Sequence, residues 1–210
     1  HSSNLIKYFT GHKMPVKKAV FSADQSFILS VSEDGTAIHW EVSSGKIISI
    51  IALKNNKILS AEYSIDGKNI ITVASNGEVN IWDANTGKQI IDFTINEKGL
   101  NSAIFNPNGK LICTISDNGS VKIWELNSKK IQSELKGYTK FISSTRFSPN
   151  EKNVIITSDS TADVWDLSDG KQIFSLVGHH DAVNFAEYSP DGNRIVTASS
   201  DNTAKIWDAR

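Results

Sequence analysis

Short apolar runs alternate with polar turns along the whole chain, and no run keeps a helical period over ten residues. The runs are rich in Ile, Val, Phe and Thr and have the length of a strand in a sheet. Clear examples are Ile28 to Val31, Asn69 to Val73, Leu111 to Ile115 and Arg194 to Thr197. Turns such as Pro107 to Gly109 separate them, because Pro fixes φ and Asn-Gly tolerates a positive φ. We therefore predict a nearly helix-free protein built from short strands.

Tryptophan recurs at an almost constant interval, in a similar apolar string each time. The intervals are 42, 42, 41 and 42 residues, and the positions are Trp40, Trp82, Trp124, Trp165 and Trp207. Self-similarity at a fixed period of this length indicates a repeat architecture. The chain therefore contains five repeats, each with four predicted strands.

This period and strand number resemble the WD-repeat family, and the resemblance covers essentially the whole chain. It implies an all-β fold, a β-propeller of five four-stranded blades that occupies residues 1–210 as a single domain. One such sheet cannot bury both of its faces alone, whereas sheets packed around an axis can. The resemblance also implies a non-catalytic scaffold for protein–protein interaction.

The chain starts and stops out of phase with its blades. Asn4 to Thr10 align with Lys171 to Val177, an outer strand, and the chain stops just after a third strand. In WD-repeat proteins the first strand commonly completes the last blade, which removes an open sheet edge. We therefore expect Leu5 to Phe9 to pair beside Lys205 to Asp208 and to close the propeller.

The number of blades leaves two possibilities open. Seven-fold geometry, the commonest in the family, places blades about 51° apart, whereas five blades close a ring only at about 72° each. A closed five-bladed ring predicts a monomer. The alternative is a structural fragment of a longer propeller, or a self-associating repeat unit without its own ligand, which predicts an oligomer.

The resemblance implies a buried hydrogen-bonded tetrad in each complete blade. It joins a His that follows Gly, a Ser or Thr on the second strand, an Asp in the next turn and the Trp, all of which need polar partners when buried. Two repeats match in full, with His12, Ser30, Asp34 and Trp40 in the first and His179, Thr197, Asp201 and Trp207 in the fifth. We expect these tetrads to be structural and to stiffen the blades on either side of the closure.

The three middle repeats depart from the tetrad pattern. The residues in place of His are Lys54, Asn96 and Tyr138, and those in place of Asp are Asn76 and Asn118. The fourth repeat is shorter before Trp165, so Thr157 and Asp159 cannot both keep the family spacing.

Loops on a rigid scaffold are where binding usually lies. The loops that lead into each blade share one face with the turns between second and third strands, and we expect a protein or peptide partner there. The candidate contact residues are Met14, Pro15, Lys57, Lys140, Phe141 and Asp181. Phe141 is either an aromatic anchor of the interface or a ring folded back over the sheet edge.

Composition narrows the function further. The net charge of −1 argues against a dedicated nucleic-acid or membrane-surface binder. The sequence contains no catalytic or phosphate-binding motif and no His or Cys residues at the spacing of metal ligands. We therefore expect that the protein is not an enzyme and that it binds no cofactor and no metal. The single Cys113 permits no disulfide within the chain, which fits a cytoplasmic, intracellular protein.

Overall fold

The computed structural model describes residues 4–95, 99–138 and 142–210, with backbone alone for 92–94. The helices and strands assigned among these residues are all β-strands, with no helix among them. Antiparallel pairing joins the strands into five sheets. The prediction of an all-β repeat fold is therefore confirmed. The chain divides into two compact units, residues 1–103 and 104–210.

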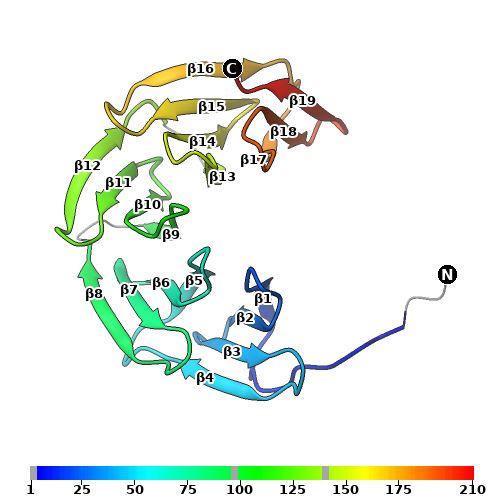
Figure 1. The fold of residues 1–210 in the computed structure, drawn as a ribbon, viewed down its shortest axis with the longest axis vertical. Helices are drawn as coiled ribbons and strands as arrows, with labels where there is room; N and C mark the ends of the chain where they lie inside the picture. Colours follow the sequence, from blue (N-terminus) through cyan, green and yellow to red (C-terminus); the bar gives the residue numbers. More distant parts are fainter. Residues whose placement is uncertain (1–3, 96–98, 139–141) are drawn as a thin grey trace. The chain divides into compact units, whose positions relative to one another are not determined.

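Residues 1–103 hold two complete four-stranded sheets and the start of a third (Figure 1). The first sheet consists of β1 (Val16–Phe21), β2 (Phe27–Ser32), β3 (Ala37–Glu41) and β4 (Ile47–Ile51). The second consists of β5 (Ile58–Tyr63), β6 (Asn69–Ala74), β7 (Glu78–Asp83) and β8 (Gln89–Thr94). Buried apolar residues of both sheets, among them Leu29, Val31, Ala61 and Ile70, form one core cluster.

The third sheet begins with β9 (Leu100–Phe105), which crosses from one unit into the other. Its remaining strands are β10 (Leu111–Ser116), β11 (Val121–Glu125) and β12 (Lys130–Leu135). The fourth sheet consists of β13 (Ile142–Phe147), β14 (Asn153–Ser158), β15 (Thr161–Asp166) and β16 (Gln172–Val177). The fifth sheet has three strands, which are β17 (Val183–Tyr188), β18 (Arg194–Ser199) and β19 (Ala204–Asp208).

The register places each Trp at the same point of its sheet. Trp40 lies opposite Ile28 on the second strand, and the other four tryptophans also face Ile or Val there. In each four-stranded sheet the pairing of the third strand with the outer strand shifts next to the Trp; in the first sheet, His39 pairs with Ser49 but Trp40 pairs with Ile47. The outer strand thus carries one extra, bulged residue at this point.

The expected pairing of Leu5 to Phe9 with the last sheet is not found. Residues 5–9 form no strand, and the fifth sheet ends at β19. The two segments fall in different compact units. The ring of Phe9 instead packs edge-on against Trp40 of the first sheet, with 5.7 Å between the ring centroids. Closure of a five-bladed ring therefore stays a proposal.

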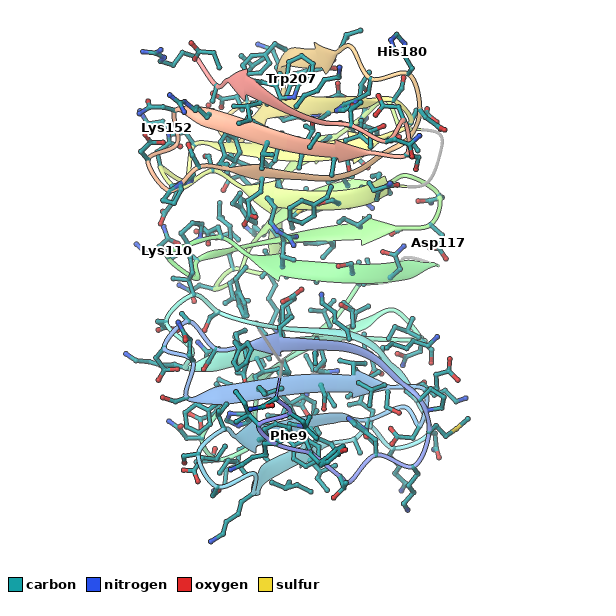
Figure 2. All side chains as sticks on the ribbon, turned by 90° about the vertical axis from the view of Figure 1, so that its right-hand side faces the viewer. Phe9, Lys110, Asp117, Lys152, His180 and Trp207 are labelled. Atoms are coloured by element: carbon teal, nitrogen blue, oxygen red, sulfur yellow. The ribbon has the colours of Figure 1, made fainter. Side chains whose placement is uncertain are left out.

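The two sides of residues 104–210 carry different turns (Figure 2). Lys110 and Lys152, in turns between first and second strands, lie on one side, whereas Asp117 and His180 lie on the other. Asp117 belongs to a turn between second and third strands, and His180 to a loop that leads into a sheet. We call the side that carries these turns and loops the loop face of each unit.

Candidate functional site

In the first sheet, four side chains form a continuous hydrogen-bonded chain. The indole N–H of Trp40 donates to Ser30 Oγ at 2.7 Å. Ser30 Oγ lies 2.8 Å from His12 Nε2, and His12 Nδ1 lies 3.0 Å from Asp34 Oδ2. A neutral imidazole protonated on Nδ1 satisfies all three contacts, because the serine hydroxyl can then donate to Nε2.

The fifth sheet repeats this arrangement with threonine in place of serine. Trp207 Nε1 donates to Thr197 Oγ1 at 2.8 Å, and that oxygen lies 2.7 Å from His179 Nε2. His179 Nδ1 lies 2.8 Å from Asp201 Oδ2. The His179 side chain has no exposed surface, so each of its ring nitrogens depends on these partners.

The Asp carboxylate of each network also accepts a backbone hydrogen bond from the loop that leads into the first strand of the sheet. Asp34 accepts the backbone amide of Lys13 at 2.9 Å, and its other oxygen accepts the amide and hydroxyl of Thr36. Burial alone would raise the pKa of Asp34, but the hydrogen bonds from Thr36, Lys13 and His12 outweigh it and hold the pKa well below its usual value. The sequence analysis missed the role of Thr36.

Asp201 does the same in the fifth sheet. It accepts the amide of His180 at 3.1 Å and the hydroxyl of Thr203 at 2.6 Å. Hydrogen bonds from Thr203, His179 and His180 lower the pKa of this carboxyl despite its desolvation. The aspartates are therefore charged near neutral pH and act as clamps between the turn and the entering loop.

Glycine precedes each network histidine because the chain runs close to the Trp ring there. A Cβ on Gly11 would come within 2.8 Å of Trp40, and one on Gly178 within 3.2 Å of Trp207. The φ of Gly178 is also +155°, which side-chain-bearing residues rarely adopt. The Gly-His pair is thus a steric requirement of the network.

The fourth sheet builds a different network around Tyr138. Trp165 pairs with Val154 as Trp40 pairs with Ile28, but the turn between the two strands is one residue shorter, and Ile156 stands where the first sheet has Ser30. Trp165 Nε1 donates instead to Tyr138 Oη at 2.7 Å, and the tyrosine donates to Asp163 at 3.0 Å. Thr157 bonds a backbone carbonyl of the first strand.

Asp163 is a buried carboxylate that the sequence did not single out. Besides Tyr138 it accepts hydrogen bonds from Gln172, at 3.2 Å, and from Ser175 on the outer strand. Burial and this neighbouring carboxylate raise the pKa of Tyr138, so the phenol stays protonated and remains a donor. Tyr138 therefore replaces both the histidine and the hydroxyl of the other networks.

Among the described residues, the second and third sheets keep the Trp–Thr bond of the tetrad. Trp82 donates to Thr72 at 2.9 Å and Trp124 donates to Thr114 at 2.8 Å. Lys54 is exposed, and Asn96 lies outside the described residues. Asn76 and Asn118 each accept the amide two residues ahead, so the turn is retained without a histidine.

The candidate contact residues on the loop face fall into three groups. Met14 and Pro15 are exposed in residues 1–103, where the Met14 carbonyl also accepts the hydroxyl of Ser32 at 2.9 Å. Lys57 packs its stem against the turn at Gly35. In residues 104–210, Asp181 is exposed, and its carbonyl accepts the hydroxyl of Ser199 at 2.9 Å. Lys140 and Phe141 lie outside the described residues.

The networks offer little for catalysis. The Ser30 hydroxyl is buried and already bonded to an indole, so it has no free approach for a substrate. Cys113 is fully buried, which raises its pKa and keeps it a thiol. In the described part of the chain, no group of three or more His, Cys, Asp or Glu residues is placed to hold a metal, and no helix could cross a membrane.

Two family models match the chain. A model described as WD domain, G-beta repeat matches residues 3–41 and 170–208, the segments that hold the two complete tetrads. A model described as Eukaryotic translation initiation factor eIF2A matches residues 29–162, which is more than half of the chain.

Curated relatives match over about one repeat each. Ribosome assembly protein 4 from Saccharomyces cerevisiae is 45% identical over 51 residues, or 24% of this chain and 10% of that protein. Periodic tryptophan protein 2 from the same yeast is 44% identical over 45 residues, 21% of this chain and 5% of its own length. Human WD repeat and SOCS box-containing protein 1 is 40% identical over 48 residues, 22% of this chain and 11% of its own. The matches thus span about a tenth or less of these relatives.

Proposed function

The chain belongs to the WD-repeat family, and its residues 29–162 also belong to the family described as Eukaryotic translation initiation factor eIF2A; on this premise we propose that it is a non-catalytic scaffold that binds a protein or peptide on its loop face. We assign it no cofactor, no nucleic-acid or membrane ligand, and an intracellular setting. Family membership of this breadth does not fix the identity of the partner.

The observation that carries this proposal is the anchoring of the entering loops. The Asp34 carboxylate holds the amide of Lys13, and Asp201 holds the amide of His180, so each loop is tied to a buried network. A loop that is already ordered loses less conformational entropy when it binds a partner. The exposed Met14 next to the first anchor offers an adaptable apolar contact.

We further propose that residues 1–210 form one propeller, closed by the N-terminal segment. Phe9 packs on Trp40 as Leu135, at the end of an outer strand, packs in one cluster with Trp165. This likeness supports a role for the segment as an outer strand beside the first sheet. On the last sheet, Ile206 is 71% exposed although its equivalents in the other repeats are buried, which is the surface that closure would cover.

An affinity capture with paired variants tests the binding proposal. The loop-face variant combines Met14→Ala with Phe141→Ala, and the control combines Lys110→Ala with Lys152→Ala in turns on the opposite side. We expect the loop-face variant to lose partners that the wild type and the control retain. Retention of every partner by the loop-face variant would show that binding uses another surface.

The exposed last sheet also favours the alternative, a fragment of a longer propeller or a self-associating repeat unit. Val196 is 42% exposed and Ile206 is 71% exposed on this sheet. Light scattering after size exclusion separates the two cases, because a closed ring gives the mass of one chain and an exposed sheet face gives a defined oligomer. An oligomer would refute the closed ring without refuting binding on the loop face.

A further inference from the structure

His39 occupies a position that is aliphatic in every other repeat. It stands directly before Trp40, and the residues before the other tryptophans are Ile81, Ile123, Val164 and Ile206. The sheet register agrees, because His39 pairs with Leu29 as Ile81 pairs with Ile71. His39 is only 1% exposed, so a titratable ring takes the place of a buried aliphatic side chain.

The surroundings of His39 are mostly apolar and aromatic. Its ring centroid lies 4.7 Å from that of Phe27 on β2 and 5.8 Å from that of Tyr63 on β5, the first strand of the next sheet. Among the described residues, neither ring nitrogen has a hydrogen-bond partner, and neither the Tyr63 hydroxyl nor that of Ser49, opposite on β4, has one. The ring therefore lies buried where the first sheet packs on the second.

The carboxylates on the neighbouring elements are engaged elsewhere. Glu62 on β5 pairs with Lys18, and Glu41 is half-exposed at the end of β3. Asp24, before β2, and Asp83, at the end of β7, accept hydrogen bonds within their own turns. One other titratable group on these strands is Tyr63, whose pKa is raised by burial and by Asp24, and another is Glu78 at the start of β7. The turns between the strands add Asp66, which accepts a hydrogen bond from Ser64, and the lysines Lys46, Lys68 and Lys88.

We propose that His39 makes the packing of the first sheet on the second sensitive to pH, so that acidification weakens this contact. A positive charge on this buried ring is costly, because the backbone of Ala84 compensates only part of the lost hydration, and unfolding or separation of the sheets relieves that cost. The matching contact in residues 104–210 joins Val164 to Tyr188 in one apolar cluster and has no group that titrates near neutral pH. It serves as an internal comparison.

The direction and size of the effect follow from linkage. Burial lowers the pKa of His39 below 6.5, and the backbone of Ala84 offsets only part of this. A histidine that stays neutral in the fold gives its full stabilisation above the unfolded pKa of about 6.5, and loses it as the pH falls below that value. If the ring takes up no proton in the fold down to pH 5.5, the ratio of unfolded to folded protein rises about tenfold between pH 7.5 and 5.5 from this residue alone, and tenfold is therefore the upper limit of the effect.

Urea unfolding of the full chain at pH 7.5 and 5.5 tests the proposal with two variants. His39→Ile installs the aliphatic residue of the other repeats, and His180→Gln removes an exposed histidine as the control. On acidification we expect the ratio of unfolded to folded protein to rise more in the wild type and in His180→Gln than in His39→Ile, by a further factor of up to about ten. Equal acid sensitivity in all three proteins would overturn the proposal.

A direct measurement on the wild type does not depend on how the variant folds. We expect the ring carbon–proton NMR signals of His39 to titrate in the folded chain only below the usual histidine midpoint of about 6.5, because burial disfavours the charged ring. Titration of His39 in the folded chain with an ordinary midpoint would mean that the ring is not held neutral, and the proposal would be wrong.

Discussion

Removal of the imidazole from the last network gives the sharpest test of what the tetrads contribute. His179→Ala leaves the hydroxyl of Thr197 without its acceptor, and Thr197 is fully buried. A buried polar group without a partner costs about 1–3 kcal/mol, and the void left by the ring adds to this. We expect His179→Ala to lower the free energy of unfolding by about 3 kcal/mol in total.

The assay is urea unfolding followed by tryptophan fluorescence, with thermal unfolding as a second readout. A loss of this size lowers the melting temperature by roughly 6–12 °C in a chain of this length. The neighbouring His180 is exposed, so His180→Ala should stay within about 0.5 kcal/mol of the wild type. An unchanged unfolding midpoint for His179→Ala would refute the view that the network stabilises the fold.

Three further outcomes are expected. Gly11→Ala should cost about 1–3 kcal/mol in thermal unfolding, because its Cβ would press on the Trp40 ring at 2.8 Å, and an unchanged melting temperature would contradict the steric argument. Tyr138→Phe should cost about 2 kcal/mol in urea unfolding, since it leaves an indole N–H and Asp163 each short of a partner; a change below about 0.5 kcal/mol would contradict this. The lowered pKa of Asp201 means that its stabilisation is present above about pH 4 and is lost as the pH falls further, so an acid titration by fluorescence should show Asp201→Asn to be less stable at pH 7 but less sensitive below pH 4.

The sequence predicted the parts of the structure that rest on local periodicity. The predicted run Leu111 to Ile115, for example, lies within β10. It could be predicted because the apolar residues of a strand and the turn residues before it, which follow Phe105, are close together in the sequence. The side chains of the first and fifth tetrads also lie where the family pattern places them, since the Gly-His pair and the turn Asp sit at fixed distances from Trp.

The network of the fourth sheet could not be read in the same way. Asp163 stands two residues before Trp165, where the other repeats carry Ile38, Asn80, Lys122 and Lys205, so no common residue type marks this position as part of a network. Its burial depends on Tyr138 and on Gln172 of the outer strand, which reach it only after the sheet has formed. Contacts between separate strands of this kind have no signature in a single sequence.

In each four-stranded sheet, a bulge in the outer strand lies beside the Trp, between the three inner strands and the rest of the outer strand. Because the register already changes there, an added or lost residue in the outer strand need not move the Trp or the groups bonded to it. Outer strands can therefore drift in length and sequence, or accept an inserted tag, while the inner three strands keep their alignment. Variation among repeats should accumulate at this outer rim first.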